Sequence, residues 1–315
     1  GNAVLLKPSE VTPGVGLIVA RLALEAGLPA GLLQVLPGTG AETGAALVSH
    51  EAVRMISFTG GTNTGRAIAG IAAQRLIPAA LELGGKSPNI VFADADSEAA
   101  VAGVIGGIFE ATGQSCVAGS RLFIERSLYS RFIDRIVAAS RALRPGLPDA
   151  AGAQIGPLAS FAQRERVERF VASGRQEGGR VLTGGARPDD AALDKGAFYL
   201  PTVIDGLSGS ATICREEIFG PVLVALPFDG EADLIAQVNE SVYGLACGIW
   251  TENYKRAWRV ARAVEAGTVW INTYKQLSIA APFGGFKQSG VGREKGLSGL
   301  RLYQQAKSLY WGLDG

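Results

Sequence analysis

The chain has 315 residues, of which 47% are apolar and 19% are charged, a balance typical of folded globular proteins. This length predicts about two domains. The 30 lysine and arginine residues nearly equal the 29 aspartate and glutamate residues, so the formal net charge is only +1. Binding to nucleic acid or to an anionic membrane normally requires a clear excess of basic residues. We therefore expect no nucleic-acid partner and no membrane partner.

The cysteine and histidine content narrows the chemistry further. Cys116, Cys214 and Cys247 are widely spaced, which supports neither a disulfide framework nor a CxxC metal or redox site. His50 is the only histidine, so sites that need several imidazole ligands are excluded and no metal site is expected. The apolar run at residues 99–109 is shorter than the roughly 20 residues that span a bilayer, and no leader segment is recognisable. These features favour a protein of the reducing cytoplasm.

The first third of the chain alternates short apolar runs with segments of helical pattern. Strands are predicted at residues 3–6, 32–36, 53–58 and 79–83. Helices are predicted at residues 9–26, 41–49 and 64–76, the first with Ser9 and Thr12 as candidate caps. Strands that alternate with helices in this way are expected to be parallel, with right-handed crossovers. This part of the chain therefore predicts a doubly wound, Rossmann-like α/β sheet of the nucleotide-binding kind.

A second region begins near Gly84, where the composition of the sequence changes. Its strands are predicted at residues 88–92, 121–125, 222–227, 246–250 and 268–271. Its helices are predicted at residues 96–111, 128–143, 162–176, 231–239 and 254–264. Residues 184–197 are rich in glycine, proline and aspartate, which indicates a loop. The predicted fold class is thus α/β, with a second α/β domain after the Rossmann-like one.

A glycine-rich turn lies between the strand predicted at 53–58 and the next helix. Gly60, Gly61 and Gly65 allow a ligand to approach the backbone closely. The first N–H groups of a helix also bind anions such as a pyrophosphate. The strict GxGxxG fingerprint is absent. From these residues alone, an ordinary strand-to-helix turn is an equally good interpretation.

Two other residues are candidates for catalysis. Cys116 follows Gly113 among small residues, so its thiolate would be reachable for attack on an electrophilic carbon. The alternative is that Cys116 is a buried packing residue, which is the more common role of a free cysteine. Glu82 is the single charge at an apolar strand end, where burial should raise the pKa of its carboxyl and suit it to general-base catalysis. A glutamate turned to solvent is an equal alternative for Glu82.

Six motifs occur together along the chain. They are KPSE at 7–10, the glycine turn at 58–65, ELGGKSP at 82–88, GQSC at 113–116, EEIFGP at 216–221 and PFGGFKQSG at 282–290. In their order and spacing the chain resembles the NAD(P)-dependent aldehyde dehydrogenase superfamily over nearly its whole length. The resemblance implies a partial NAD-binding domain at 1–84 and a catalytic domain at 85–288. It also implies a return segment to the cofactor domain at 289–304 and an oligomerisation strand at 305–315.

The resemblance further implies a reaction. Cys116 is expected to add to an aldehyde carbonyl, and the resulting thiohemiacetal is expected to lose a hydride to NAD and become a thioester. Glu82 is expected to activate the water that hydrolyses this thioester to a carboxylic acid. Relatives that transfer the acyl group to coenzyme A generally lack this glutamate, so Glu82 favours the hydrolytic branch.

The resemblance implies a set of cofactor contacts: Lys7, Glu10, Thr59, Gly60, Gly61, Gly65, Glu217 and Phe219. Lys7 and Glu10 match the contacts to the adenosine ribose, where a carboxylate accepts hydrogen bonds from both hydroxyls and repels a 2′-phosphate. NAD is therefore expected rather than NADP. Glu217 matches the ligand of the nicotinamide ribose, and Phe219 matches the aromatic side chain beside it.

Other implications concern the substrate and the rest of the protein. The loop at 273–281 matches a variable part of the substrate funnel, and Lys275 within it favours an acidic or polar aldehyde. Members of the superfamily are longer at the amino end. We therefore expect a truncated member that lacks the first strand of the nucleotide fold and an asparagine of the oxyanion site. The parent protein is expected to be a homo-oligomer, a dimer or tetramer. The alternative function is a catalytically silent nucleotide-binding or subunit-interaction protein.

Overall fold

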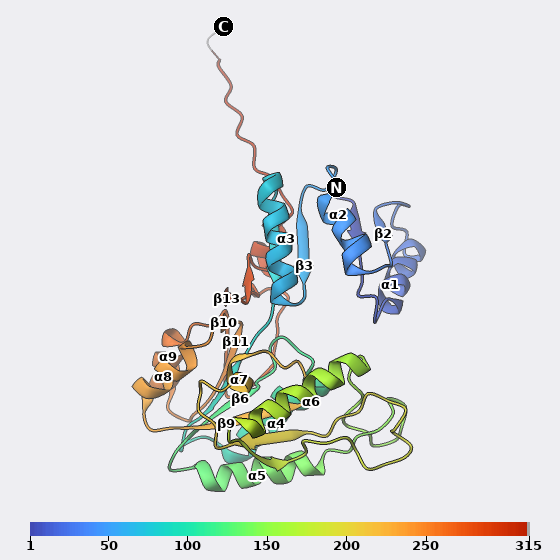
Figure 1. Ribbon diagram of the computed structural model, residues 1–315. Helices are drawn as coiled ribbons and strands as arrows, with labels where there is room; N and C mark the ends of the chain where they lie inside the picture. The colour runs from blue at the N-terminus through green and yellow to red at the C-terminus, as the bar shows by residue number, and fades with distance from the viewer. Residues whose placement is uncertain (314–315) are drawn as a thin grey trace.

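The computed structural model describes residues 1–313 and shows an α/β protein in two parts. Figure 1 shows a large lobe around a broad sheet and a smaller part that carries the amino-terminal residues. The elements of the smaller part are β1 (Val4–Leu6), α1 (Gly14–Glu25), β2 (Leu33–Val35), a π-helical turn (Gly40–Gly44), α2 (Ala45–Ser49), β3 (Ile56–Thr59), α3 (Thr62–Arg75) and β4 (Ala79–Glu82).

The smaller part contains two sheets where the sequence predicts one. β1 pairs with β2, and β3 pairs with β4, both in parallel as expected. Within residues 1–313, however, no backbone pairing joins the β1–β2 sheet to the β3–β4 sheet. The Rossmann-like part is therefore divided between two small sheets, and β1 and β3 each keep one edge that none of the described strands covers.

Local turns explain two shifted helix starts. Ser9 and Thr12 do not cap α1, because the backbone N–H of Thr12 donates to the carbonyl oxygen of Ser9 at 3.2 Å and closes a separate turn. The helix begins instead at Gly14, after Pro13, whose fixed φ suits the start of a helix. α3 begins two residues earlier than predicted, directly after the extended Gly61.

The large lobe carries the second α/β unit. Its elements are β5 (Pro88–Val91), α4 (Ser97–Phe109), β6 (Arg121–Glu125), α5 (Tyr129–Ala142), α6 (Phe161–Gln176), β7 (Arg180–Thr183), β8 (Thr202–Asp205), α7 (Thr212–Arg215), β9 (Val222–Phe228), α8 (Glu231–Asn239), β10 (Tyr243–Gly244), β11 (Ala246–Trp250), α9 (Tyr254–Ala263), β12 (Thr268–Ile271) and β13 (Phe286–Lys287). The seven-stranded sheet has the order β12-β11-β5-β6-β9-β8-β7, and only the β7–β8 pair is antiparallel. β10 and β13 form a separate two-stranded antiparallel pair.

The sheet of the large lobe is covered on both faces, which explains why its strands are apolar throughout. Alternate residues of β6 point to opposite faces. Leu122 and Ile124 belong to the core shared with α4 and α5. Phe123 belongs to the core shared with α6, α8 and α9. The result is a three-layer α/β lobe around a central sheet.

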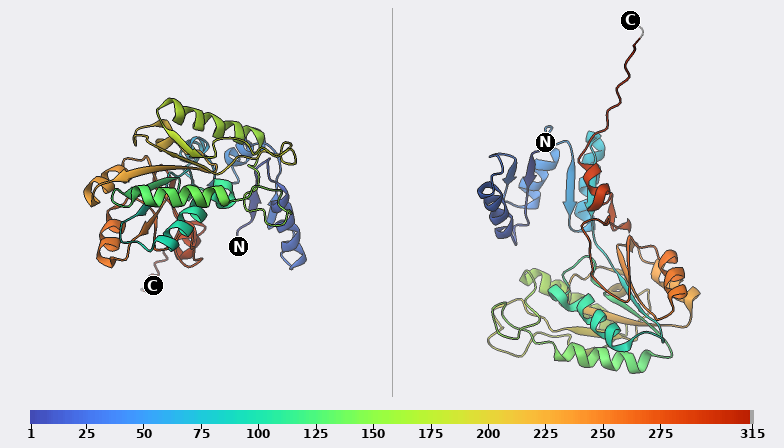
Figure 2. Two further views of the ribbon diagram at one scale, coloured as in Figure 1. Left: turned by 90° about the horizontal axis from the view of Figure 1, so that it is seen from below. Right: turned by 180° about the vertical axis from the view of Figure 1, so that it is seen from behind.

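The end of the chain returns to the smaller part. β14 (Gly290–Val291) pairs antiparallel with β4, and α10 (Gly296–Leu302) follows it. Residues 305–313 are extended and leave the body of the protein, as Figure 2 shows. They form no strand in the single chain, since a strand needs a hydrogen-bonded partner. Residues 314 and 315 of the predicted oligomerisation strand lie outside the described residues. The domain boundaries stay predictions.

Substitution of the core residue Phe132 on α5 tests this packing. Its side chain is 0% exposed, so Phe132→Ala should lower the free energy of unfolding by about 3–5 kcal/mol through lost burial and a residual cavity. Urea unfolding followed by circular dichroism measures the change. Phe161→Ala is the matched control, because Phe161 is 51% exposed and its loss should cost less than about 1 kcal/mol. Equal losses in the two variants would contradict the proposed core.

Across residues 1–313, no helix combines the length and the apolar character needed to cross a bilayer.

Candidate active site

Cys116 lies in the loop between α4 and β6, and its neighbours fix the path of that loop. Gly113 has a φ of 70°. A Cβ atom at Gly113 would lie 2.1 Å from the carbonyl oxygen of Gly220, so only glycine fits there. On the other side of the thiol, the Tyr274 hydroxyl donates to the carbonyl oxygen of Val117 at 2.9 Å. The loop is thus held at both ends.

The turn that precedes this loop contains two strained residues. Ala111 and Thr112 have φ values of 54° and 56°, a left-handed conformation that costs non-glycine residues on the order of 1 kcal/mol each and is often found at functional sites. The Thr112 hydroxyl donates to the carbonyl oxygen of Gly156 at 3.1 Å and holds the turn. For this reason α4 ends at Phe109, before the residue 111 that the pattern predicts.

The three thiols differ in access. Cys116 is partly exposed, whereas Cys214 and Cys247 are buried. Burial raises the pKa of the Cys116 thiol, and the negative charges of Glu217 and Glu82 raise it further. Cys116 is therefore the thiol that a substrate can reach, and its ionisation is sensitive to charge changes nearby.

Glu82 is the last residue of β4, where β14 pairs with it through Gly290. Its side chain is 4% exposed, and its Oε2 has no hydrogen-bond partner within the protein. A Cβ atom on Gly284 would lie 2.8 Å from Oε1, so glycine there leaves room for the carboxyl group. Burial, reinforced by the charge of Glu294 and opposed by Arg293, raises the pKa of Glu82 to about 8. Such a carboxyl can exchange a proton near neutral pH.

The loop after β4 brings Glu82, Cys116 and Glu217 to one place. A Cβ atom on Gly85 would lie 2.3 Å from the carbonyl oxygen of Cys116, which shows how closely the two backbones approach. The N–H of Gly85 donates to Oε1 of Glu217 at 3.0 Å. A Cβ atom on Gly84 would lie 2.6 Å from Oε2 of the same carboxyl group. The two glycines therefore form a cradle for Glu217 beside the thiol.

The segment that carries Glu217 and Phe219 is fixed by α6. The Gln163 amide donates to the carbonyl oxygens of Ile218 and Phe219 at 3.0 and 2.8 Å, and Arg166 donates to that of Glu217 at 2.8 Å. Burial raises the pKa of Glu217. Phe219 has a φ of 59° and an exposed ring. Sequence reasoning missed Gln163 and Arg166, because nothing in the pattern of α6 marks a contact with a segment about fifty residues away.

The predicted glycine turn lies beside Glu82. Thr59 is the register partner of Glu82, and the N–H of Gly60 donates to the carbonyl oxygen of Glu82 at 3.0 Å. α3 starts after Gly61 without a side-chain cap, so its first N–H groups stay available to an anion. A Cβ atom on Gly65 would lie 2.4 Å from a leucine side chain of the loop after β4. This glycine thus lets α3 pack against the loop that positions the catalytic candidates.

Lys7 and Glu10 form a separate cluster. Nζ of Lys7 lies 3.2 Å from Oε2 of Glu10 and donates to the carbonyl oxygen of Pro8 at 2.8 Å. A hydrogen bond from its own backbone N–H, together with Lys7, lowers the pKa of Glu10, so its carboxylate is ionised at neutral pH. Among the described residues, no hydrogen bond or ion pair joins this cluster to the turn at 60–65.

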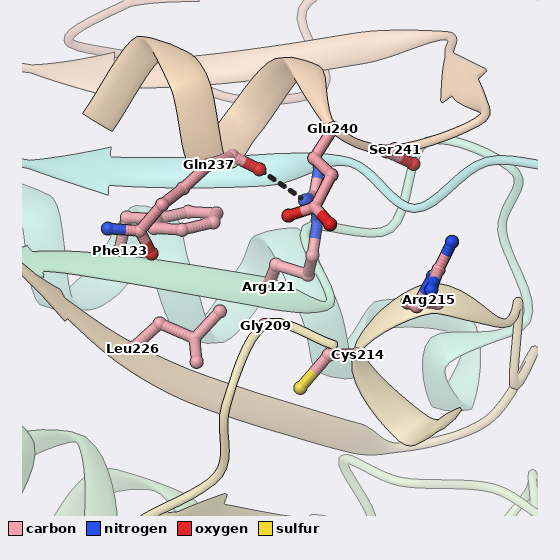
Figure 3. Close-up of a pocket in the computed structure, with 9 residues that line it drawn as sticks. All are labelled: Arg121, Phe123, Gly209, Cys214, Arg215, Leu226, Gln237, Glu240 and Ser241. Atoms are coloured by element: carbon pink, nitrogen blue, oxygen red, sulfur yellow. Dashed lines mark hydrogen bonds between the residues drawn. The ribbon is translucent and has the colours of Figure 1, made fainter. Parts of the chain in front are cut away.

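A small cavity of about 20 Å³ lies apart from these residues, under the start of β6 (Figure 3). The Arg121 guanidinium donates to the carbonyl oxygens of Lys86 and Gln237 at 2.8 and 3.4 Å, and Cys214 lines the opposite wall. Its volume suits about one water molecule. It is too small for a dinucleotide or an aldehyde, so we interpret it as a packing cavity beside β6 and not as a ligand site.

Comparison with known proteins first defines the fold. An NAD+ complex of an aldehyde dehydrogenase from Bacillus cereus superimposes with a TM-score of 0.96 and 44% sequence identity, covering 99% of this chain and 62% of that one. The crystal structure of PnpE in complex with nicotinamide adenine dinucleotide gives a TM-score of 0.98 at 42% identity, covering all of this chain and 64% of that one. The α/β fold is thus that of the aldehyde dehydrogenases.

The family follows from the sequence comparison. The family model described as "Aldehyde dehydrogenase family" matches residues 1–309, and the chain belongs to this family. A betaine aldehyde dehydrogenase of Mesorhizobium japonicum is 46% identical over 310 residues. That match covers 98% of this chain and 63% of the relative, so the chain spans less than two thirds of the length of the curated relatives that it matches.

Proposed function

We propose that this protein oxidises an aldehyde to a carboxylic acid and transfers the hydride to NAD. The observation that carries the proposal is the placement of the reachable Cys116 thiol and the buried Glu82 carboxyl, whose pKa is raised to about 8, on segments that approach each other closely at Gly85. A thiol and a carboxyl with these properties are a nucleophile and a general base. Membership of the aldehyde dehydrogenase family supports the choice of substrate class.

The described residues fit a dinucleotide. The uncapped start of α3 suits the pyrophosphate, and the ionised Glu10 beside Lys7 suits a ribose with two free hydroxyls. Glu217, held against Gly85, would contact the second ribose. Bound NAD supplies the hydride acceptor. The NAD-bound structures of the Bacillus cereus enzyme and of PnpE support this assignment. A 2′-phosphate would meet the negative charge of Glu10, which favours NAD over NADP.

The chain's own groups would carry the reaction in two halves. In the first, the Cys116 thiol gives its proton to solvent and its sulfur bonds to the aldehyde carbon. The thiohemiacetal oxyanion then forms beside the N–H groups of Cys116 and Val117, which also lower the pKa of the thiol and can donate to the new negative charge. Loss of a hydride, with its two electrons, from that carbon leaves a thioester on Cys116. In the second half, Glu82 takes a proton from water as the water oxygen attacks the thioester. The carbon–sulfur bond then breaks and releases the acid.

The parent protein is proposed to be a cytoplasmic homo-oligomer. Leu309, Tyr310 and Trp311 are almost fully exposed in the single chain, and an extended apolar segment of this kind is suited to pairing with a second subunit. The three free cysteines favour a reducing compartment.

NADH formation followed at 340 nm tests the proposal, with NAD or NADP and with short aliphatic, aromatic and carboxylated aldehydes. We expect turnover with NAD and at least about tenfold weaker kcat/KM with NADP, because of the charge of Glu10. NAD binding is measured in parallel by calorimetry. Binding without turnover of any aldehyde would reject the dehydrogenase and leave the silent nucleotide-binding protein. Absence of NAD binding would reject both.

A further inference from the structure

Two oppositely charged side chains face each other beside the Cys116 loop. Nζ of Lys275 lies 3.2 Å from Oε2 of Glu110. The same ammonium group donates to the carbonyl oxygen of Gly106 at 3.1 Å. The Lys275 side chain is only 16% exposed, whereas that of Glu110 is 68% exposed. Lys275 is therefore not a free cation, and the expectation that it attracts an acidic aldehyde loses its basis.

The pair borders the thiol from two independent segments. Glu110 begins the strained turn that ends at Gly113, three residues before Cys116. Lys275 directly follows Tyr274, whose hydroxyl binds the carbonyl oxygen of Val117, the residue after the thiol. Lys275 also has a φ of 58°, so its backbone is held in a strained conformation that directs this loop toward α4. Both charges thus lie on the two segments that border the Cys116 loop.

Equal and opposite charges at similar distances nearly cancel in their effect on an approaching ion. A carboxylated aldehyde gains little attraction from Lys275, because Glu110 repels it. An aldehyde that carries a quaternary ammonium gains little from Glu110, because Lys275 repels it. The remaining charges beside the thiol, Glu82 and Glu217, are unchanged in the Lys275 and Glu110 variants, so their effect drops out when each variant is compared with the wild type.

We propose that the Lys275–Glu110 pair cancels charge at the entrance to the Cys116 site and thereby selects uncharged aldehydes. The inference rests on the proposed function for its substrate class. Removal of Glu110 exposes a cation beside the thiol and should favour anionic reactants. Removal of Lys275 exposes an anion and should favour cationic reactants. The two single changes therefore have opposite signs, which a merely structural role of the loop would not produce.

The experiment measures the field at the thiol without requiring turnover. The probes are two thiol reagents, the anionic 2-sulfonatoethyl and the cationic 2-trimethylammonioethyl methanethiosulfonates. In each, the Cys116 thiolate bonds to the thioalkyl sulfur, the reagent's sulfur–sulfur bond breaks, and methanesulfinate leaves with the electron pair. Cys214 and Cys247 are buried, so the fast phase reports Cys116, and a Cys116→Ala variant verifies this. The ratio of the two rate constants removes any change in thiolate fraction.

At low ionic strength, Glu110→Gln should raise the anionic-to-cationic rate ratio about five- to tenfold, and Lys275→Gln should lower it by a similar factor. The double variant should return to within about twofold of the wild type. Glu252→Gln is the matched control, since Glu252 is exposed just past the carboxyl end of β11. The opposite end of β11 is the one near the site, because Leu245, directly before the strand, lies against Gly85. Ratios that stay within twofold of the wild type in both single variants would overturn the proposal.

The substrate class is then read from kcat/KM for butanal, 4-oxobutanoate and betaine aldehyde. The wild type should prefer butanal, Glu110→Gln should gain on 4-oxobutanoate, and Lys275→Gln should gain on betaine aldehyde. A wild type that prefers either charged aldehyde refutes the selection. A wild type that forms no NADH with any aldehyde refutes the proposed function instead, while the reagent ratios still decide whether the pair cancels charge.

Discussion

Replacement of Cys116 by alanine is expected to reduce NADH formation by about 10⁴-fold or more, because no other described thiol can reach a substrate and the covalent route is lost. NAD binding should stay within about threefold of the wild type, since the proposed cofactor contacts lie on other segments. Initial rates at saturating NAD measure the first quantity and calorimetry measures the second.

Cys214→Ala is the matched control for this prediction. It removes a thiol of the same kind from a buried position, so it should change kcat by less than about threefold while lowering stability slightly. A Cys116→Ala enzyme that keeps more than a hundredth of wild-type turnover would mean that the aldehyde is oxidised without a bond to this sulfur.

Sequence reasoning was most successful where the signals were local. The strands at 121–125, 246–250 and 268–271 and the helix at 231–239 have the predicted bounds. In each, an apolar run or a helical pattern ends at residues that favour turns. The two-residue strands β10, β13 and β14 had no such signal, because they exist only through partners that lie elsewhere in the chain.

The same distinction applies to the site. Cys116 and Glu82 were candidates from their own motifs, and their catalytic roles, which stay predictions, came from the resemblance. The structure brings the end of β4 and the Cys116 loop together through Gly85. The effect of the Glu294 charge on the pKa of Glu82 was not predictable from the sequence. About two hundred residues separate the two glutamates, and no motif around Glu294 indicates that it lies near Glu82. The position of the Glu217 carboxyl was likewise not predictable, because it depends on contacts with the backbone of Gly84 and Gly85, which lie far away in the sequence.

Strain around the site was equally invisible in the sequence. Ala111 is a strong helix former, yet it has a φ of 54°. Tertiary contacts of the 110–113 turn override its helical propensity, and this is why the helix pattern extends beyond the real end of α4. Lys275 likewise takes a left-handed conformation in which its ammonium meets Glu110.

Glu82→Gln is expected to separate the two halves of the reaction. The amide cannot accept a proton from water, so hydrolysis of the thioester should slow by about 10²–10⁴-fold, while hydride transfer continues for one turnover. A burst of NADH of one equivalent per site should precede a slow steady state. Intact-protein mass spectrometry should then show the acyl group on Cys116, a mass increase that Cys116→Ala cannot give.

The pH dependence follows from the pKa of Glu82, which burial, above all, and the charge of Glu294 raise to about 8. A raised carboxyl pKa means that the basic form is a minority at pH 7, about a tenth of the molecules, and predominates above pH 8. Steady-state turnover of the wild type should therefore rise through pH 8. Glu294→Gln removes the second cause, so this rise should move to lower pH. If Glu82→Gln keeps the same rise and shows no burst, another group activates the water and the assignment of Glu82 fails.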